Sequence, residues 1–397
     1  MIPLSVMVTG RGTVSFRIKG PYGRKAPSRF TSVLKPMVFW NITYKCNLFC
    51  VHCYISASPQ GMPGELGTDD VLRIADDIVK LGSPMTVISG GEPLVRGDFW
   101  LIAERLIGGG VKVSLSTNGT LISSRVASKL AELGISYVGI SLDSVNPQYH
   151  DKFRGAPGAF EKALMGIRNS IDAGLPVGLR MTLTRYNIGE AEALVELSRR
   201  LGVGRIAFYL IDLTGRARGD LDLLPTREQL ENFVDTMIKV SMDTGGDPEI
   251  LVVRGNFVGV RVADKLATSR EEFLEYMSMI SAQGDCGRKT VSIYPDGSVK
   301  PCQFIDWVTI GNAREESLTK ILSLENEKLK PYLEAYKNLR GPKCSTCIFK
   351  VICGGGSRGR ALAYTGDPWG DDPLCFLDPE LIARKWGLTE EDLSKFG

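Results

Sequence analysis

Six short apolar runs alternate with amphipathic helical stretches over the first 215 residues, and this alternation restricts the possible folds more than any other feature of the sequence. Apolar strands separated by amphipathic helices form parallel sheets that are covered on both faces. The pattern therefore predicts an α/β fold built on a partial (β/α)6 barrel of the TIM type. The expected strands are residues 36–43, 85–89, 111–116, 137–142, 177–183 and 205–211, and the expected helices are 68–81, 99–107, 123–133, 160–173 and 190–201.

Chemically distinctive residues fall at the carboxyl ends of these strands, where barrels of this type carry their active sites. They are Cys46, Cys50 and Cys53, residues 90–93, residues 117–119, Asp143 and Arg180. We expect them to meet at one rim. Arg180 and, less strongly, Asp143 should each meet an opposite charge or a dipole, because an unpaired buried charge is costly. Arg154 lies in a loop rich in glycine and proline, which favours exposure at the surface.

The first three cysteines have the spacing C-x3-C-x2-C, at Cys46, Cys50 and Cys53. A four-iron cubane cluster needs four ligands, so three thiolates leave one iron free for an external molecule. Two other interpretations are ordinary buried cysteines, which are common in cores, and a zinc site, which normally has four ligands. His52 could complete a zinc site, although its position between Cys50 and Cys53 makes convergence on one ion strained.

The last part of the chain holds the other six cysteines. Cys344, Cys347, Cys353 and Cys375 supply four thiolates, enough for a closed iron–sulfur cluster or a structural zinc site. Cys286 and Cys302 flank a hairpin expected over residues 291–300 and offer only two ligands. They could belong to a partial site, bind nothing, or hold a cluster completed by a group other than cysteine.

The chain divides into four parts on these patterns. Residues 1–35 form a basic N-terminal extension, and residues 36–215 form the partial barrel. Residues 216–285 form a bridging region, with helices expected over 226–242 and 271–279, and residues 286–397 form the cysteine-rich auxiliary-cluster domain.

Charge and composition narrow the classes of protein. The net charge of +3 hides an asymmetry, because the first 64 residues contain eight Lys or Arg and no acid, leaving 40 basic against 45 acidic residues. This basic front either holds the carboxylates of an anionic substrate or is a solvated extension. It lacks the aromatic interleaving of nucleic-acid-binding segments. Only two histidines are present, so a Ser-His-Asp hydrolase is not expected.

The expected location is the cytoplasm, because no secretory signal and no apolar run of membrane-spanning length is recognisable. Nine cysteines in a cytoplasmic chain indicate metal or redox sites rather than disulfides.

The cysteine loop, together with Gly90-Gly91-Glu92-Pro93, strongly resembles the radical S-adenosylmethionine (SAM) superfamily. The resemblance implies an enzyme in which the amino and carboxylate groups of SAM chelate the open iron of a [4Fe-4S] cluster. Reduction of the cluster then releases a 5′-deoxyadenosyl radical. The implied cluster ligands are Cys46, Cys50 and Cys53. The implied SAM contacts are His52 and Tyr54 near the adenine, Gly90, Gly91, Glu92 and Pro93 at the amino group, and Ser116, Asn118, Ser141 and Arg180 along the ribose, methionine or carboxylate.

The C-terminal part resembles the SPASM extension, which carries auxiliary clusters. Its usual pattern has a cysteine four positions after the one matched by Cys353, where this chain has Ser357. The first auxiliary site therefore lacks a ligand, whereas the second is complete in Cys344, Cys347, Cys353 and Cys375. The resemblance implies two [4Fe-4S] clusters, one with an open iron and one auxiliary.

Within that group, nearly the whole chain resembles the tetrapyrrole-modifying enzymes of the siroheme-dependent heme and heme d1 pathways. The matching stretches are residues 38–43, 136–143, 153–155, 303–304, 311–315 and 365–369. Residues 372–375 look most like the didecarboxysiroheme deacetylase branch, which also lacks a cysteine at the position of Ser357. That branch often lacks a cysteine at the position of Cys302 as well, so the presence of Cys302 is a departure.

The resemblance implies an oxygen-sensitive enzyme that removes acetate side chains from 12,18-didecarboxysiroheme, giving iron-coproporphyrin III or a heme d1 precursor. Its expected partners are an anionic tetrapyrrole and a reductant such as ferredoxin or flavodoxin, with no nucleic acid and no membrane. Alternatives in the superfamily are a peptide maturase and a propionate decarboxylase that makes heme. Outside it, the alternative is a non-catalytic iron–sulfur electron-transfer protein.

Overall fold

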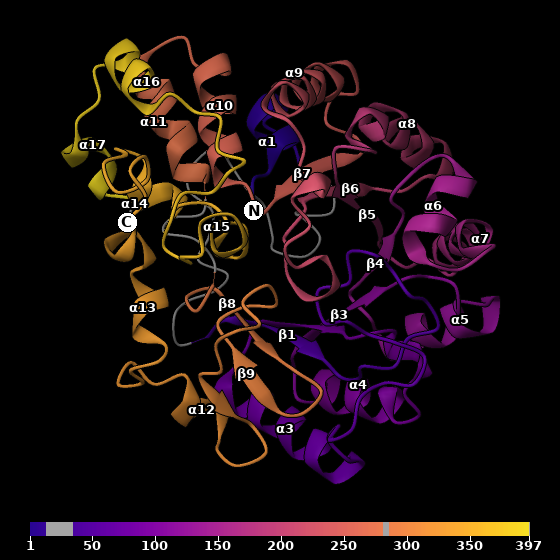
Figure 1. The fold of residues 1–397 in the computed structure, drawn as a ribbon. Coiled ribbons are helices and arrows are strands. Elements are labelled where there is room, and N and C mark those ends of the chain that lie inside the picture. The colour runs from indigo at the N-terminus through magenta and orange to yellow at the C-terminus, as the bar shows by residue number, and fades with distance from the viewer. Residues whose placement is uncertain (13–34, 281–285, 397) are drawn as a thin grey trace.

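The computed structural model describes residues 1–12, 35–280 and 286–396, and within these residues the strands form one sheet in the order β10-β9-β8-β1-β2-β3-β4-β5-β6-β7 (Figure 1). Successive strands from β1 to β7 pair in parallel, and β8 pairs in parallel with β1. The strands are β1 Met37–Asn41, β2 Met85–Ser89, β3 Lys112–Thr117, β4 Tyr137–Ser141, β5 Val177–Leu183, β6 Arg205–Leu210, β7 Glu249–Val253, β8 Thr290–Ile293, β9 Ser298–Lys300 and β10 Gly311–Asn312.

The six strands expected from the apolar runs are confirmed as β1 to β6, and with them the α/β class. Their central side chains, such as Ile88, Leu115 and Leu179, are completely buried. β7 is a further parallel strand that the sequence analysis did not predict, because its residues lie in the stretch interpreted as a helical bridge. At the first residues of β6 and β7, Arg205 and Glu249 form a buried ion pair of 3.2 Å.

Helices follow the strands as the periodicity predicts, and Figure 1 shows them around the outer side of the sheet. α3 illustrates the local cause: Val71, Ile74 and Ile78 recur on one buried face, and Gly82 ends the helix in the left-handed conformation. None of the helices in the described ranges is long and apolar enough to cross a membrane. The helices up to residue 280 are α1 Leu4–Thr9, α3 Thr68–Leu81, α4 Phe99–Gly108, α5 Ser124–Leu133, α6 Pro147–Arg154, α7 Ala159–Asp172, α8 Ala191–Leu201, α9 Arg227–Asp243, α10 Asn256–Leu266 and α11 Arg270–Met279.

The first ten residues pack into the core, which differs from the solvated or substrate-facing extension considered for residues 1–35. Ile2, Leu4 and Met7 are buried, and Ile2 forms an antiparallel bridge with Val252 of β7. Arg11 is exposed, and residues 13–34, with most of the basic side chains of this front, lie outside the described residues. The apolar start of the chain therefore closes the edge of β7 near α9 (Figure 1).

The cysteine-rich part is continuous with the sheet. The expected hairpin is confirmed as β8 and β9, and β8 continues the sheet beyond β1. Short helices then cover the side of the molecule opposite α5 to α8 in Figure 1. They are α12 Leu318–Ile321, α13 Lys330–Leu333, α14 Lys350–Cys353, α15 Arg358–Thr365, α16 Pro379–Trp386 and α17 Glu390–Ser394.

Candidate active site at the carboxyl ends of the strands

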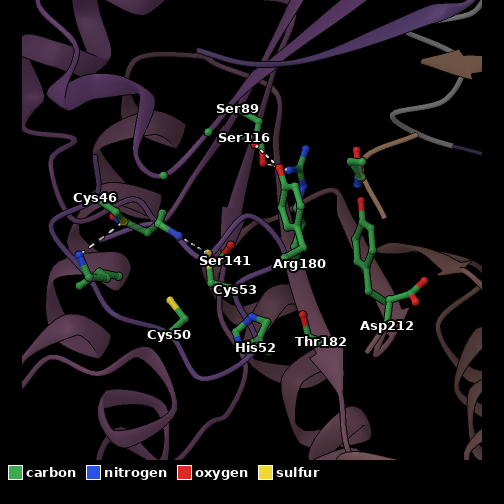
Figure 2. A pocket seen from close by; sticks show the side chains of 18 of the residues that line it. Cys46, Cys50, His52, Cys53, Ser89, Ser116, Ser141, Arg180, Thr182 and Asp212 are labelled. Atoms are coloured by element: carbon green, nitrogen blue, oxygen red, sulfur yellow. Dashed lines mark hydrogen bonds between the residues drawn. The ribbon is translucent and has the colours of Figure 1, made fainter. Parts of the chain in front are cut away.

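A pocket that opens to solvent lies at the carboxyl ends of β1 to β6, and its empty space together with the solvent at its mouth amounts to about 1080 Å³. Figure 2 shows the cysteine loop and His52 on one side of it and Arg180 and Asp212 on the other. Most of the residues selected from the sequence meet here, as the strand-end argument predicts. Those that line the pocket are Cys46, Cys50, His52, Cys53, Tyr54, Gly90, Gly91, Ser116, Asn118, Ser141 and Arg180.

The sulfur atoms of the cysteine loop are free of disulfides and accept hydrogen bonds. The Leu48 amide donates to Cys46 Sγ at 3.4 Å, and the Ala57 amide donates to Cys53 Sγ at 3.3 Å. Burial raises the pKa of the Cys46 thiol to about 12, so its thiolate needs a positively charged partner. Hydrogen bonds to the sulfurs are a regular feature of iron–sulfur sites, where they tune the reduction potential.

The glycine turn holds the cysteine loop by backbone contacts. The Gly91 amide donates to the Thr43 carbonyl at 2.7 Å, and the Glu92 amide donates to the Lys45 carbonyl at 2.9 Å. A Cβ on Gly91 would overlap the Lys45 carbonyl, and Gly90 has a φ of 147°, which disfavours other residues. The two glycines are therefore needed for this close approach.

Glu92 and Pro93 lie behind the lining of the pocket. The Glu92 carboxylate is fully buried and accepts hydrogen bonds from Thr117 Oγ1 at 2.9 Å, the Asn118 amide at 2.9 Å and the Leu94 amide at 3.2 Å. Burial raises its pKa to about 7, against these hydrogen bonds, which lower it. The carboxylate thus joins β2 to the end of β3, and its role toward SAM stays a prediction.

His52 and Tyr54 differ in how they are held. His52 stacks on Phe153 with a ring separation of 4.3 Å, and burial keeps its pKa well below the usual value. Tyr54 Oη donates to Asn41 Oδ1 at 2.5 Å and lies 3.2 Å from Ser89 Oγ. Both aromatic rings are therefore fixed beside the sulfurs.

Arg180 fulfils the expectation that it meets a dipole. Its guanidinium donates to Ser116 Oγ of β3 across the intervening strand β4. Gly139 leaves the space that the guanidinium occupies, because a Cβ there would overlap Arg180 Nε. Ser116 and Arg180, from β3 and β5, therefore form one polar wall of the pocket.

Arg154 is buried, so its expected exposure at the surface was wrong. Its side chain is 9% exposed, and Nη2 lies 2.5 Å from Oδ2 of the fully buried Asp143. Nη1 also donates to Cys50 Sγ at 3.7 Å. The charge of Asp143, expected to need a partner, is compensated by this arginine.

Several residues in the pocket or against the cysteine loop were not selected from the sequence. Arg216 donates to the carbonyls of Cys50 and Ala57 and lies 3.7 Å from the centroid of the Phe49 ring. Asp212 and Phe304 also line the pocket, Asp212 on the side away from the labelled cysteines (Figure 2) and Phe304 with its ring centroid 5.4 Å from that of Tyr54. Arg216 follows a glycine after β6 with no local signal, whereas Asp212 follows β6 directly and could have been selected by the strand-end argument.

The C-terminal cysteines separate into two sets. Cys344, Cys347, Cys353 and Cys375 are free of disulfides, and burial raises the pKa of each thiol, to about 12 for Cys344 and about 11 for Cys347. Cys286 is disulfide-bonded to Cys302, so the expectation of metal or redox sites rather than disulfides does not hold for this pair. Within the described residues, no group of three or more His, Cys, Asp or Glu converges as ligands to a single metal ion. Four free thiolates can supply one ligand to each iron of a cubane cluster.

Comparison with known proteins agrees with this geometry. Residues 40–198 match the radical SAM superfamily, and residues 285–348 match the SPASM iron–sulfur cluster-binding domain. An Fe-coproporphyrin III synthase of Methanosarcina barkeri strain Fusaro is 35% identical, over 96% of this chain and 99% of its own length. A pre-heme d1 synthase of Dinoroseobacter shibae is 32% identical, over 86% of each chain. A mycofactocin maturase of Mycolicibacterium smegmatis is 31% identical, over 85% of this chain and 81% of its own.

Streptococcus suis SuiB bound to S-adenosylmethionine has the same fold, with a TM-score of 0.66 at 17% identity, over 86% of this chain and 78% of its own. The expected cofactors, an open [4Fe-4S] cluster, an auxiliary cluster and SAM, are those of the matched families. The chain therefore belongs to the radical SAM superfamily and is an enzyme of that superfamily with a C-terminal SPASM domain.

Proposed function

We propose that this chain acts in tetrapyrrole biosynthesis and removes the acetate side chains of 12,18-didecarboxysiroheme, giving iron-coproporphyrin III. The observation that carries the proposal is the match with the Fe-coproporphyrin III synthase over 96% of this chain and 99% of that protein. A match of such extent includes the pocket wall contributed by Gln303 and Phe304, beyond the part that generates the radical. A heme d1 precursor is the alternative product, because the pre-heme d1 synthase is nearly as similar.

The residues present fit the cofactors. In the proposal, Cys46, Cys50 and Cys53 bind the open cluster, and SAM lies between that loop and the wall formed by Ser116, Ser141 and Arg180. When bound, the reduced cluster and SAM supply a 5′-deoxyadenosyl radical. The fit rests on three observations: unpaired sulfurs that accept amide hydrogen bonds, glycines that bring the backbone close to the pocket, and the Arg180 guanidinium.

The chain's own contribution is to position the bound groups. Tyr54 and His52 are held by Asn41, Ser89 and Phe153, so they can confine an adenine ring beside the sulfurs. Tyr209 and Phe304 also line the pocket and add aromatic surface, which suits the flat apolar face of a tetrapyrrole. Cys344, Cys347, Cys353 and Cys375 hold the auxiliary cluster in this proposal.

The test is an anaerobic incubation of the reconstituted protein with SAM, a reductant and 12,18-didecarboxysiroheme. We expect 5′-deoxyadenosine and a tetrapyrrole whose mass has fallen by two acetate groups. 5′-Deoxyadenosine with an unchanged tetrapyrrole would contradict the proposed substrate. Absence of 5′-deoxyadenosine both with and without the tetrapyrrole would instead favour the non-catalytic electron-transfer alternative.

A second candidate is maturation of a ribosomal peptide, favoured by the 31% identity with the mycofactocin maturase. It predicts that a small precursor peptide, added to the same assay, loses mass while the tetrapyrrole stays unchanged.

A further inference from the structure

We propose that the first auxiliary-cluster position of the SPASM domain holds no cluster in this protein, and that the guanidinium of Arg254, paired with Asp212 and Ser357, fills its place. Cys286 and Cys302 would then be bonded to each other rather than to iron. The inference concerns a site apart from the radical-generating cluster and does not depend on the identity of the substrate.

The residues that would bind the first auxiliary cluster surround Arg254. Cys286, Cys302 and Ser357 are far apart in sequence but meet around one guanidinium. Arg254 Nη1 lies 3.3 Å from Cys286 Sγ and 3.9 Å from Cys302 Sγ, and Nη2 donates to Ser357 Oγ at 3.0 Å. Ser357 stands where the SPASM pattern has a ligand cysteine. The guanidinium therefore lies between the positions from which a cluster would be bound.

The positive charge of Arg254 is paired with a buried carboxylate. Arg254 Nη2 lies 2.7 Å from Asp212 Oδ2, and the side chain of Asp212 is 1% exposed. Ser357 Oγ donates to the same oxygen at 2.6 Å. A buried carboxylate next to a cluster with anionic thiolate ligands would be strongly unfavourable without a cation. The positive charge of Arg254 thus compensates the negative charge of Asp212, and Ser357 hydrogen-bonds to both. This is expected for a group of side chains that takes the place of the cluster.

Both the backbone and the guanidinium of Arg254 are held by surrounding contacts. Arg254 follows β7 with a φ of 69°, a conformation that is uncommon outside glycine and persists where surrounding contacts impose it. Its carbonyl accepts a hydrogen bond of 2.6 Å from Arg360, which is fully buried. Its guanidinium lies 4.9 Å from the centroid of the Phe304 ring, a wall of the pocket. The guanidinium therefore also backs the pocket wall.

Native mass spectrometry of the anaerobically reconstituted full chain tests the inference without substrate. We expect two [4Fe-4S] clusters in the wild type and in the double variant Cys286→Ser/Cys302→Ser. The matched control Cys347→Ser/Cys353→Ser should lose about half of the iron, since one of two cubanes is removed. A lower cluster count in Cys286→Ser/Cys302→Ser would overturn the inference.

A second measurement keeps the test valid if Cys286→Ser/Cys302→Ser does not fold. A protein with Cys46, Cys50, Cys53, Cys347 and Cys353 all replaced by Ser should bind no cluster, and a cluster retained there would overturn the inference. The role of the guanidinium is tested by Arg254→Met, which should lower the melting temperature more than Arg199→Met, whose exposed pair with Glu196 is the control. Equal melting temperatures for Arg254→Met and the wild type would remove Arg254 from the proposal.

Discussion

Arg154 Nη1 lies 3.7 Å from Cys50 Sγ, although the two residues are 104 positions apart in the sequence. The contact is built by backbone pairing, since the Phe49 amide donates to the Arg154 carbonyl at 3.0 Å and the Val51 amide donates to the Phe153 carbonyl at 3.0 Å. Gly155, with a φ of 69°, allows this approach, because a Cβ there would overlap the Phe49 carbonyl. The loop that carries the sulfurs is thus fixed against a buried cation.

Replacing Arg154 with Gln should make the reduction potential of the radical-generating cluster more negative. Reduction adds negative charge to the cluster, and a nearby cation stabilises the reduced form. With an effective dielectric constant near 20 and a separation of about 5–7 Å, the shift for this one-electron couple is on the order of 100–150 mV. A potentiometric titration followed by electron paramagnetic resonance measures it.

Two variants control for side effects of Arg154→Gln. Arg154→Lys keeps the charge and should keep most of the potential, whereas Arg154→Gln/Asp143→Asn removes both charges of the pair and should recover part of the shift. An unchanged potential in Arg154→Gln, with the cluster signal intact, would show that this cation does not act on the cluster.

Glu92 should make the folded protein less stable as the pH rises. Its pKa in the folded protein is raised to about 7 by burial, above its value in the unfolded chain. The folded state therefore binds the proton more tightly, and the resulting stability is complete at low pH and is lost as pH rises through 7. Between pH 6 and pH 8 the loss is about 1 kcal/mol.

The variant Glu92→Gln isolates this contribution, because the histidines titrate equally in both proteins. The Glu92→Gln variant should be less stable than the wild type by about 1–3 kcal/mol at both pH values, because a buried hydrogen-bond acceptor is lost. The difference from the wild type should shrink by about 1 kcal/mol from pH 6 to pH 8, as measured by urea unfolding under anaerobic conditions. A difference that stays constant or grows would mean that Glu92 is charged throughout this range.

Most of the site could be predicted from the sequence, because the ends of the strands follow from local patterns. Apolar runs such as 85–89 and 111–116 identify strands, and a parallel sheet brings the residues that follow them to one edge. The burial of Arg154 could not be predicted in this way, because its partners Asp143 and Cys50 lie on other elements. The burial of the Glu92 carboxylate against Thr117 is likewise set by a contact between the end of β3 and the turn after β2.

β7 and α1 were not predicted from the sequence for a different reason. β7 is a short apolar run directly after Asp247 and Pro248, within a region dominated by long helices, so periodicity favoured a helical bridge. The first ten residues carry no charge, a signal of burial that the many basic residues from Arg11 onward concealed. In both cases an average over a long segment hid a short buried element.

Replacing Arg360 with Met should destabilise the junction between the sheet and the SPASM domain. The side chains of Arg360 and Asp372 are fully buried and 2.6 Å apart, and Arg360 also donates to the Ile211 carbonyl at 2.9 Å. Removing one partner of a buried pair leaves an uncompensated charge, with an expected cost of about 3–5 kcal/mol. Urea unfolding measures it, and Arg360→Met/Asp372→Leu should be less destabilised than the single variant. A single variant with wild-type stability would show that Asp372 finds another partner.

Gly139→Ala should weaken SAM binding through Arg180 alone. Gly139 and Gly178 are paired across β4 and β5, and an added Cβ at Gly139 would overlap Arg180 Nε, displacing the guanidinium from Ser116. Loss of one hydrogen bond from a charged group costs about 1.5–3 kcal/mol, which corresponds to a roughly 10- to 100-fold rise in Kd. Equilibrium dialysis of SAM with the reconstituted protein measures this without turnover.

Gly178→Ala is the matched control for Gly139→Ala, since its added Cβ would overlap the Tyr137 hydroxyl instead of Arg180. Both alanines introduce a clash of similar size on paired residues, so both should lower the melting temperature. Only Gly139→Ala should change the Kd for SAM, because Tyr137 does not line the pocket and Arg180 does. Equal effects of the two variants on the Kd would mean that general strain in β4 and β5, and not the position of the Arg180 guanidinium, controls SAM binding.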